Sequence, residues 1–411
     1  MINNNKILNY NNFVFGFFTP RICTFVLMSQ LPPALQRRLN QRQEACSLRE
    51  LAASNALIDF ASNDYLGFAK SEIIFNQTHQ LLVDRNLKIN GATGSRLLSG
   101  NHDLYAEAET HIAEFHQAET ALIFNSGYDA NVGFFSCVPQ KGDFILYDEL
   151  SHASIRDGIQ MSHAKSYKFS HNDCEALEGL IKRCNTAKAA IYIVTESVFS
   201  MDGDTPELER LIALSEANGC YLVIDEAHAL GVFGENGAGL LQNLNCHDRV
   251  FARIVTFGKG LGCHGAAVLG STLLKNYLVN FARSFVYTTA LAPPAIATIL
   301  IAYQQLKAAQ TQRQQLRDNI NFFNREKQIG GLKPLFVPSK SAIQSAIFPG
   351  NQKVKNIATQ LQGCNFNVKA ILSPTVPEGL ERLRFCIHSY NSEAEISKVL
   401  QLLSTFVFSK L

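Results

Sequence analysis

From about residue 121 onward, short and nearly continuous apolar segments alternate with longer amphipathic ones. The apolar segments are Ala121–Phe124, Phe144–Tyr147, Ala189–Thr195, Tyr221–Ile224, Ile254–Phe257 and Ala266–Leu269. A strand that is apolar at almost every position has to be covered on both faces. Alternation of such strands with helices predicts an α/β fold with a mainly parallel sheet, in which ligands bind at the carboxyl ends of the strands.

The remainder of the chain has a different pattern. After Pro293-Pro294 a helical stretch runs to about Lys327, and strand-like pieces at Ala342–Phe348 and Arg382–Ile387 precede a closing helix that starts at Glu393. This pattern predicts a second, smaller α+β domain. A helix is also predicted over Pro32–Leu51. We divide the chain into an unstructured leader (1–27, or sequence upstream of a true start at Met28), an N-terminal segment (28–74), a large domain (75–293) and a small C-terminal domain (294–411).

Composition excludes several classes of protein. Hydrophobic residues make up 46% of the 411 residues, which is enough for a sizeable core. Lysine and arginine number 37 against 35 acidic residues, a balance that argues against non-specific nucleic-acid binding. No run of 18 apolar residues predicts a membrane span. The ten cysteines form no Cys-x-x-Cys pair, so we expect reduced thiols, no metal site and a cytoplasmic protein.

The segment YLVIDEAHALG places Asp225 at the end of an apolar run, followed by Glu226 and His228. A carboxylate in this position can simply cap a turn. The D-E-A-H sequence also resembles the acidic box of a nucleotide-driven motor, which requires a phosphate loop G-x-x-x-x-G-K-[ST]. The Gly258-Lys259 pair is followed by glycine and is preceded five residues earlier by Arg253, so the motor interpretation fails.

The segment RIVTFGKGLGCHG contains G-x-G-x-x-G after a strand-like run. A dinucleotide site also needs an acidic residue about 20 positions later for the ribose, and residues 266–300 contain no Asp or Glu. What remains is Lys259, which follows a strand among glycines, where burial would lower its pKa and make it nucleophilic toward an aldehyde. A lysine that binds an aldehyde, together with an Asp225 that pairs with a protonated pyridine nitrogen, predicts pyridoxal 5'-phosphate (PLP).

Other segments can complete such a site. In IFNSGY a strand ends and a helix begins at Ser126, so that the backbone N–H groups of Gly127 and Tyr128 can hold a phosphate. Hydroxyl groups that can add to this phosphate site are those of Thr256, Thr288 and Thr289. In DELSHAS, His152 can stack on the cofactor ring, and His228 can donate to its phenolic oxygen.

These residues lie in motifs that resemble the α-oxoamine synthases, PLP enzymes with the aspartate-aminotransferase-like fold (fold type I). The matching motifs, in the family's order, are SNDYLG at Ser62–Gly67, GSRLLSG at Gly94–Gly100, LSHAS at Leu150–Ser154, TESVFSMDGD at Thr195–Asp204, DEAHALG at Asp225–Gly231, TFGKG at Thr256–Gly260 and RLRF at Arg382–Phe385. They extend from about Pro32 to the C-terminus. The leader has no counterpart in the family pattern.

The resemblance implies roles for individual residues. Lys259 is expected to bind the PLP aldehyde covalently, Asp225 to pair with the ring nitrogen and His152 to stack on the ring. Ser200 and His228 are expected near the phenolic oxygen. The residues expected at the cofactor or its phosphate are Ser126, Gly127, Tyr128 and Thr256, with Thr288 and Thr289 reaching the phosphate of a partner subunit in a homodimer with shared sites. Asn63 and Arg382 are expected to position the amino-acid substrate, with Arg384 ranked second for its carboxylate.

The implied reaction is a decarboxylative condensation of an amino acid with an acyl thioester of coenzyme A or a carrier protein. Within the family, the D-E-A-H form with Ala227 favours members of the biotin pathway, which use L-alanine and a pimeloyl thioester. The alternatives are members that use glycine with acetyl-CoA, those that use serine with palmitoyl-CoA, and 5-aminolevulinate synthases. A non-catalytic partner subunit is disfavoured because Lys259, Asp225 and His152 are all present.

Overall fold

The computed structural model describes residues 31–51, 56–184 and 189–408. The chain divides into two compact units, Met1–Ala52 and Ala53–Leu411. The predicted leader, 1–27, lies outside the described residues. In the first unit, α1 spans Pro33–Glu44, with proline in its first turn, where no backbone donor is lost. The helix is shorter than the predicted range Pro32–Leu51.

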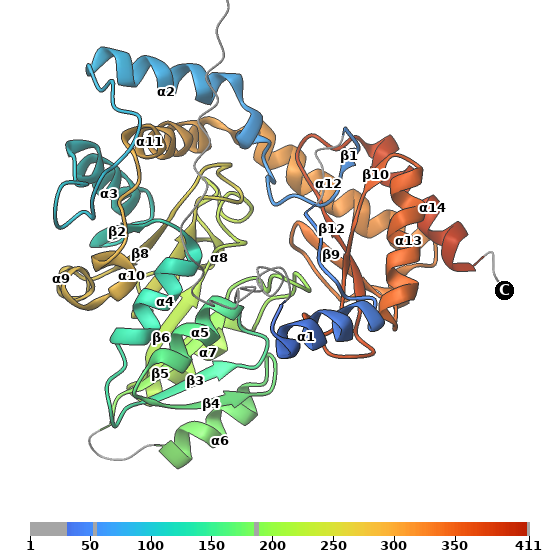
Figure 1. Ribbon diagram of the computed structural model, residues 1–411, viewed down its shortest axis with the longest axis horizontal. Helices are drawn as coiled ribbons and strands as arrows, with labels where there is room; N and C mark the ends of the chain where they lie inside the picture. Colours follow the sequence, from blue (N-terminus) through green and yellow to red (C-terminus); the bar gives the residue numbers. More distant parts are fainter. Residues whose placement is uncertain (1–30, 52–55, 185–188, 409–411) are drawn as a thin grey trace, which may run out of the picture. The chain divides into compact units, whose positions relative to one another are not determined.

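The described part of the second unit contains a seven-stranded sheet with the order β2-β8-β7-β6-β5-β3-β4 (Figure 1). Its strands are β2 (Thr120–Phe124), β3 (Phe144–Asp148), β4 (Lys165–Phe169), β5 (Ile191–Glu196), β6 (Tyr221–Asp225), β7 (Ala252–Thr256) and β8 (Ala266–Gly270). Neighbouring strands from β4 across to β7 are parallel, and β8 is antiparallel to both of its neighbours. All six apolar runs identified in the sequence are strands of this sheet, which confirms the α/β prediction.

The prediction missed β4, for a physical reason. It forms an edge of the sheet, and four of its five residues are exposed. An edge strand need not be apolar on both faces, so the sequence KSYKF carries no continuous apolar signal. The inner strands do carry it, because consecutive residues point to opposite faces and both faces are covered. Leu122 and Ile123, for example, lie in different core clusters, and each is only 1% exposed.

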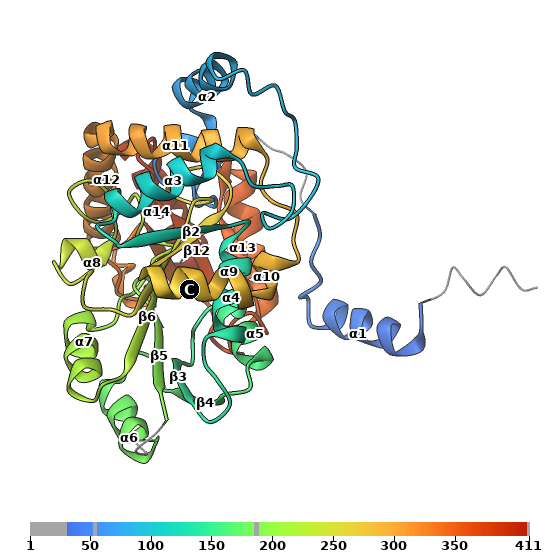
Figure 2. The same ribbon diagram turned by 90° about the vertical axis from the view of Figure 1, so that its left-hand side faces the viewer.

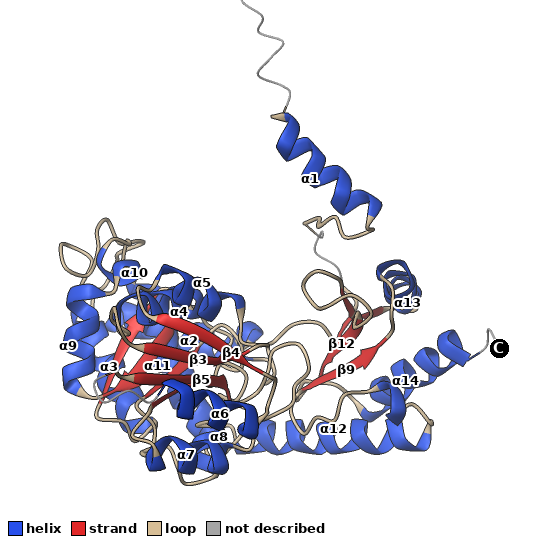
Figure 3. Cartoon of the chain, turned by 90° about the horizontal axis from the view of Figure 1, so that it is seen from below, coloured by secondary structure: helices blue, strands red, loops and turns tan. Residues whose placement is uncertain are grey.

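Helices lie on both sides of this sheet (Figure 3). They are α2 (Glu72–Asp84), α3 (Asp103–Phe115), α4 (Gly127–Cys137), α5 (Ala153–Met161), α6 (Cys174–Cys184), α7 (Leu208–Ala217), α8 (Leu240–Asn243), α9 (Thr272–Phe281), α10 (Arg283–Val286) and α11 (Pro293–Ala308). Helix α7 ends at Ala217 and is followed by Asn218 and by Gly219, a glycine with positive φ that does not continue the helix. Helix α11 lies along α2 and α3 (Figure 2).

The helical stretch predicted from Pro293 to Lys327 is two helices, α11 and α12 (Gln310–Ile329), separated at Ala309. The Leu306 carbonyl, which a continuous helix would satisfy from Gln310, instead accepts from the Ala309 N–H and the Arg313 guanidinium. Helix α11 packs on helices of the large sheet, whereas α12 packs on the C-terminal helix α14 (Glu393–Phe408). The domain boundary at 293/294 stays a prediction.

The C-terminal part forms the predicted α+β layer. A three-stranded sheet has the order β11 (Lys369–Ile371), β12 (Arg382–Cys386), β9 (Ile343–Ile347), with α13 (Asn351–Gly363) and α14 beside it. Strand β1 (Ile58–Asp59) pairs in parallel with β10 (Phe366–Asn367). Short 3-10 helices occur at Phe68–Lys70 and Lys333–Leu335. The β1–β10 pairing brings the SNDYLG segment, which follows β1, to the C-terminal sheet.

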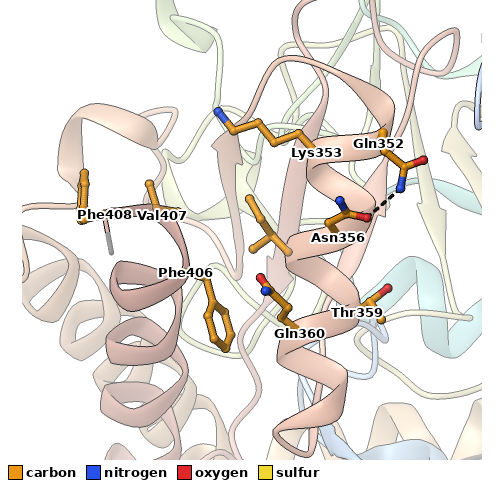
Figure 4. A pocket seen from close by; sticks show the side chains of 9 residues that line it. Gln352, Lys353, Asn356, Thr359, Gln360, Phe406, Val407 and Phe408 are labelled. Carbon is orange, nitrogen blue, oxygen red and sulfur yellow. Dashed lines mark hydrogen bonds between the residues drawn. The ribbon is translucent and has the colours of Figure 1, made fainter. Parts of the chain in front are cut away.

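A groove of about 900 Å³ lies between α13 and the end of α14, lined by Gln352, Lys353, Asn356, Ile357, Thr359, Gln360, Phe406, Val407 and Phe408 (Figure 4). None of these residues belongs to a motif singled out in the sequence. Within the described ranges, no helix has both the length and the apolar character that crossing a bilayer requires. Among the same residues, no cluster of three or more His, Cys, Asp or Glu side chains could hold a metal ion.

Candidate active site

The sheet topology brings the predicted residues to one edge. Glu196 and Asp225 are the last residues of the parallel neighbours β5 and β6, and they lie opposite each other in register. Thr256 ends the next strand, β7, and leads into the turn that carries Lys259. This turn packs tightly, because a Cβ at Gly262, whose φ is +59°, would lie 2.1 Å from the backbone nitrogen of Ala69. The turn is therefore held against the short 3-10 helix Phe68–Lys70, which directly follows the SNDYLG segment.

Lys259 begins a chain of hydrogen bonds that runs into this segment. Its Nζ lies 2.7 Å from Nε2 of His228, and Nδ1 of His228 lies 2.7 Å from the Tyr65 hydroxyl. Tyr65 then donates to Oδ1 of Asn63 over 3.2 Å. His228 and Tyr65 are buried, and the Lys259 side chain is partly exposed. The structure thus joins the predicted residues Lys259, His228 and Asn63 through a tyrosine.

The electrostatics of this cluster favour a reactive amine. Burial lowers the pKa of Lys259 to about 8, although the carboxylates of Asp225 and Glu196 oppose the shift. Burial and the nearby Lys259 charge hold the pKa of His228 well below its usual range, so its imidazole is neutral. Burial also raises the pKa of Glu196 to about 8, and the adjacent Asp225 charge adds to this rise. A substantial fraction of Lys259 is therefore neutral and nucleophilic at mildly alkaline pH.

The two arginines of RLRF have different partners. Arg382 is buried in an ion pair with Asp202. Arg384 donates from Nη2 to Oδ1 of Asn63 over 3.0 Å and from Nε to the carbonyl of Ser200 over 2.7 Å. The positive charge of Arg384 also helps to lower the pKa of Lys259. The geometry thus favours Arg384 over the first-ranked Arg382 as the cation beside the amine, because Arg382 is already neutralised by a buried carboxylate.

His152 lies at the start of α5 and is exposed in the described chain. Its backbone N–H donates to Oε1 of Glu196 over 2.7 Å, and its Nδ1 lies 2.7 Å from the Ser154 hydroxyl. Asp225 accepts hydrogen bonds from the side chain of Asn131 over 2.9 Å and from the backbone of Ala227 over 2.8 Å. The Lys259 charge lowers the pKa of His152 and the Asp225 charge raises it, so the predicted stacking residue lies in the same cluster.

The predicted phosphate site lies at the start of α4. The backbone N–H groups of Gly127 and Tyr128 are the first of this helix and have no partner within it. A Cβ at Gly127 would lie 2.5 Å from Oγ1 of Thr256, so glycine keeps this site open. The Ser126 hydroxyl donates to the Asp129 carboxylate and accepts from the Asp129 N–H, so it caps the helix rather than pointing to an open site.

The predicted threonine pair lies beside the residue before Ser126. The side chain of Asn125 donates to Oγ1 of Thr288 over 3.1 Å and to the carbonyl of Thr289 over 2.7 Å. The Tyr128 ring is half exposed, and its hydroxyl donates to Asp157. Within the described chain no hydrogen bond joins Thr288 or Thr289 to Lys259, and their role toward a partner subunit stays a prediction.

Sequence reasoning did not select three residues that the structure places in the cluster. Tyr65 lies in the SNDYLG motif, two residues after the selected Asn63. Glu196 is the second residue of TESVFSMDGD, and its position at a strand end next to Asp225 was a signal that could have identified it. Asn131 lies one turn into α4 and belongs to no quoted motif, so only its hydrogen bond to Asp225 reveals it.

The arrangement fits PLP by the chemistry of its groups. A partly buried amine with a lowered pKa suits the aldehyde, and a buried carboxylate suits the pyridine nitrogen. The open N-terminus of α4, with Gly127 packed against Thr256, suits the phosphate. Lys259, Asp225 and the start of α4 would hold the cofactor, which when bound acts as an electron sink.

Comparison with known proteins agrees with this fit. Residues 55–403 match the aminotransferase class I and II family. An 8-amino-7-oxononanoate synthase from Emericella nidulans is 38% identical over 92% of this chain and 96% of its own length. A serine palmitoyltransferase from S. paucimobilis, solved with a PLP–myriocin adduct, has a TM-score of 0.83 at 24% identity and covers 92% of this chain and 97% of its own.

A solved 8-amino-7-oxononanoate synthase from Francisella tularensis has a TM-score of 0.73 at 28% identity, over 87% of this chain and 99% of its own. These similarities extend over nearly the whole length of each protein. They confirm the predicted fold and cofactor. The chain therefore belongs to the aminotransferase class I and II family of PLP-dependent enzymes with fold type I, and within it to the α-oxoamine synthases.

Proposed function

We propose that this enzyme is an 8-amino-7-oxononanoate synthase. It joins L-alanine to a pimeloyl thioester, with release of CO₂ and of the thiol of coenzyme A or of a carrier protein. The identity to the Emericella nidulans synthase over nearly the full length of both chains supports this choice. The observation that carries the amino-acid part of the proposal is the position of Arg384 beside Asn63 and Lys259.

Arg384 and Asn63 bind the substrate's carboxylate in this proposal. The Arg384 guanidinium is buried, and it is held by the Ser200 carbonyl and the Asn63 amide rather than by a carboxylate. A fixed, desolvated guanidinium whose hydrogen bonds go to a carbonyl and an amide oxygen, and not to a carboxylate, binds a substrate carboxylate strongly. Arg382 serves instead to hold the segment that contains Asp202.

Proton transfer at the amino acid's α-carbon is assigned to Nζ of Lys259. PLP, when bound, stabilises negative charge at this carbon. With a pKa near 8, Nζ can both accept and return a proton near neutral pH. His228 lies 2.7 Å from Nζ and is itself neutral, so it orients the amine without adding a positive charge. Asp225, fixed by Asn131 and Ala227, supplies the negative charge that keeps the pyridine nitrogen protonated.

A homodimer is part of the proposal. The GSRLLSG loop packs on the segment that follows Thr289, since the Ala290 N–H donates to the Gly94 carbonyl. Leu98 of this loop is 85% exposed, and Tyr287 is 74% exposed. Large apolar groups exposed on both sides of the threonine pair are typical of an interface between subunits. Leu98→Asp should reduce the molecular mass in solution from that of a dimer to that of a monomer, as measured by light scattering.

The compartment proposed for the enzyme is the cytoplasm. The described cysteines are free thiols, which suits a reducing environment.

The substrate choice is tested by a comparison of donors and acceptors. The purified holoenzyme is assayed with pimeloyl-CoA, acetyl-CoA and palmitoyl-CoA, each with alanine, glycine and serine, and thiol release and the amino ketone are both measured. We expect the highest kcat/KM with alanine and pimeloyl-CoA. A higher value with glycine and acetyl-CoA, or with serine and palmitoyl-CoA, would overturn the substrate assignment while leaving the family membership intact.

A further inference from the structure

A chain of hydrogen bonds, which we call the Asn131 chain, lies beside the predicted PLP ring site. The side-chain amide of Asn131 donates to Oδ2 of Asp225 over 2.9 Å and to the Ser154 hydroxyl over 3.0 Å. The same hydroxyl lies 2.7 Å from Nδ1 of His152, and the His152 N–H donates to Glu196. This N–H is the backbone group of His152, and Glu196 is the neighbour of Asp225 in the strand register, so both ends of the chain lie at the same edge of the sheet.

The direction of each hydrogen bond follows from its donors. An amide NH₂ group can only donate, and the opposite amide orientation would place Oδ1 of Asn131 against the Asp225 carboxylate. Asn131 therefore directs one N–H to Asp225 and the other to Ser154. Since Ser154 accepts this bond, its own O–H is free to donate to Nδ1 of His152.

Nδ1 of His152 also faces a second donor. The backbone N–H of Ser154 points to it over 3.2 Å, the usual side-chain cap at the start of a helix. A ring nitrogen that accepts from two donors cannot carry a proton, so Nε2 carries it. Although the residue as a whole is exposed, desolvation of its ring on the side of the cluster and the nearby Lys259 charge lower the pKa of His152, which also favours the uncharged ring.

Asn131 and Ser154 are fully enclosed. Asn131 is 2% exposed and Ser154 is 0% exposed, and a Cβ at Gly158 of α5 would lie 2.9 Å from the Asn131 carbonyl. Helices α4 and α5 thus pack closely around the Asn131 chain, and neither side chain can turn to an alternative partner in solvent. Such a buried polar network is rigid when its directions agree.

We propose that Asn131 and Ser154 are positioning residues that hold His152 as the neutral tautomer with its proton on Nε2 and tie its ring to the Asp225 carboxylate. The inference rests on the proposed PLP site, in which His152 covers one face of the ring and Asp225 meets its nitrogen. Its consequence is that the group covering the ring carries no positive charge, so the pyridinium opposite Asp225 meets no competing cation from that side.

The test measures the tautomer directly. Protein labelled with ¹⁵N-histidine is examined by long-range ¹H–¹⁵N NMR, with and without PLP, and the His152 signals are assigned by their loss in His152→Gln. We expect an unprotonated Nδ1 and a protonated Nε2 in the wild type. In Asn131→Asp, a carboxylate would accept the Ser154 proton, the Ser154 hydroxyl would then accept from the imidazole, and Nδ1 should become protonated.

Two further variants separate positioning from folding. Ser154→Ala removes the hydroxyl but keeps the backbone donor, so we expect a mixture of both tautomers of His152. The kcat should fall at least tenfold, and the KM for the amino acid should change less than twofold. Ser136→Ala, in helix α4, removes a hydroxyl that donates to the Gly133 carbonyl of its own helix, and it should change neither the tautomer of His152 nor kcat.

A protonated Nδ1 in the wild type, or a tautomer that is unchanged in both Asn131→Asp and Ser154→Ala, would overturn the inference. These NMR results do not depend on turnover. If pimeloyl-CoA is not a substrate but the tautomer shifts as expected, the substrate proposal fails and the positioning role stands.

Discussion

A half-buried histidine outside the catalytic cluster gives the enzyme a pH-dependent stability that can be worked out from the structure. Nδ1 of His171 lies 2.9 Å from Asp148, and Nε2 lies 2.7 Å from Asp204. The Asp148 side chain is 0% exposed and that of His171 is 22% exposed. Despite burial, which opposes the charge, the two carboxylates raise the pKa of His171 to about 10. The histidine is therefore the cation between two acids.

A raised pKa of a cation in the folded state stabilises that state at low pH. The contribution is fully present below the unfolded pKa of about 6.5 and is lost as the pH rises through about 10. The shift corresponds to roughly 5 kcal/mol at about 1.4 kcal/mol per pKa unit. The loss of one member of a buried ion pair lowers protein stability by about 3–5 kcal/mol, which agrees with the figure obtained from the pKa shift. We therefore expect His171→Asn to lower the free energy of unfolding by about 3–5 kcal/mol at pH 7.

The assay is urea unfolding of the wild type and His171→Asn at fixed protein and PLP concentrations, at pH 7 and at about pH 10.5. The difference between the two proteins should shrink to roughly 1 kcal/mol or less at the higher pH, because the wild-type histidine is then uncharged as well. His163→Asn, a change at an exposed histidine, is the control and should differ from wild type by no more than roughly 0.5 kcal/mol at either pH. A difference for His171→Asn that stays constant or grows with pH would refute the argument.

Two further predictions concern the ligand sites. Arg384→Ala should raise the KM for the amino acid roughly 10- to 100-fold, because a charge-assisted hydrogen bond is lost, and should have little effect on the KM for the thioester. Arg382→Ala should chiefly lower the melting temperature, because it breaks a buried ion pair. Equal kinetic effects of the two changes would contradict the assignment. Gly127→Ala should weaken PLP binding at least tenfold in an absorbance titration, because the new methyl group would collide with the Thr256 hydroxyl. The helical control Gly179→Ala, whose Cβ would meet nothing within 4 Å, should bind PLP normally.

Much of the catalytic half of the site follows from local sequence. Asp225 comes directly after a buried parallel strand, and Lys259 follows another in a glycine-rich turn. The carboxyl ends of parallel strands lie at the same edge of a sheet, so these two residues had to come near each other once the sheet was recognised. The same reasoning applies to Glu196, which ends a third strand and could have been selected on that basis.

Only the tertiary structure distinguishes the two arginines of RLRF by their partners. Residues two apart in a strand point to the same face, so the sequence provides no reason to prefer one of them. The ion pair of Arg382 with Asp202, a residue 180 positions away, neutralises that arginine and leaves Arg384 to face Asn63 and the amine. Partner choice over such separations depends on packing, not on local pattern.

The sequence by itself determined the sheet, the cofactor chemistry and the lysine–aspartate pair, because apolar periodicity and strand-end position act over a few residues. The tertiary structure alone decided what surrounds that pair: Tyr65 behind His228, the hydrogen-bond chain through Asn131, and Arg384 as the guanidinium that is not paired with a carboxylate in its hydrogen bonds. Each of these depends on side chains from distant segments that meet only after the chain has folded, and their hydrogen bonds leave no periodic trace in the sequence.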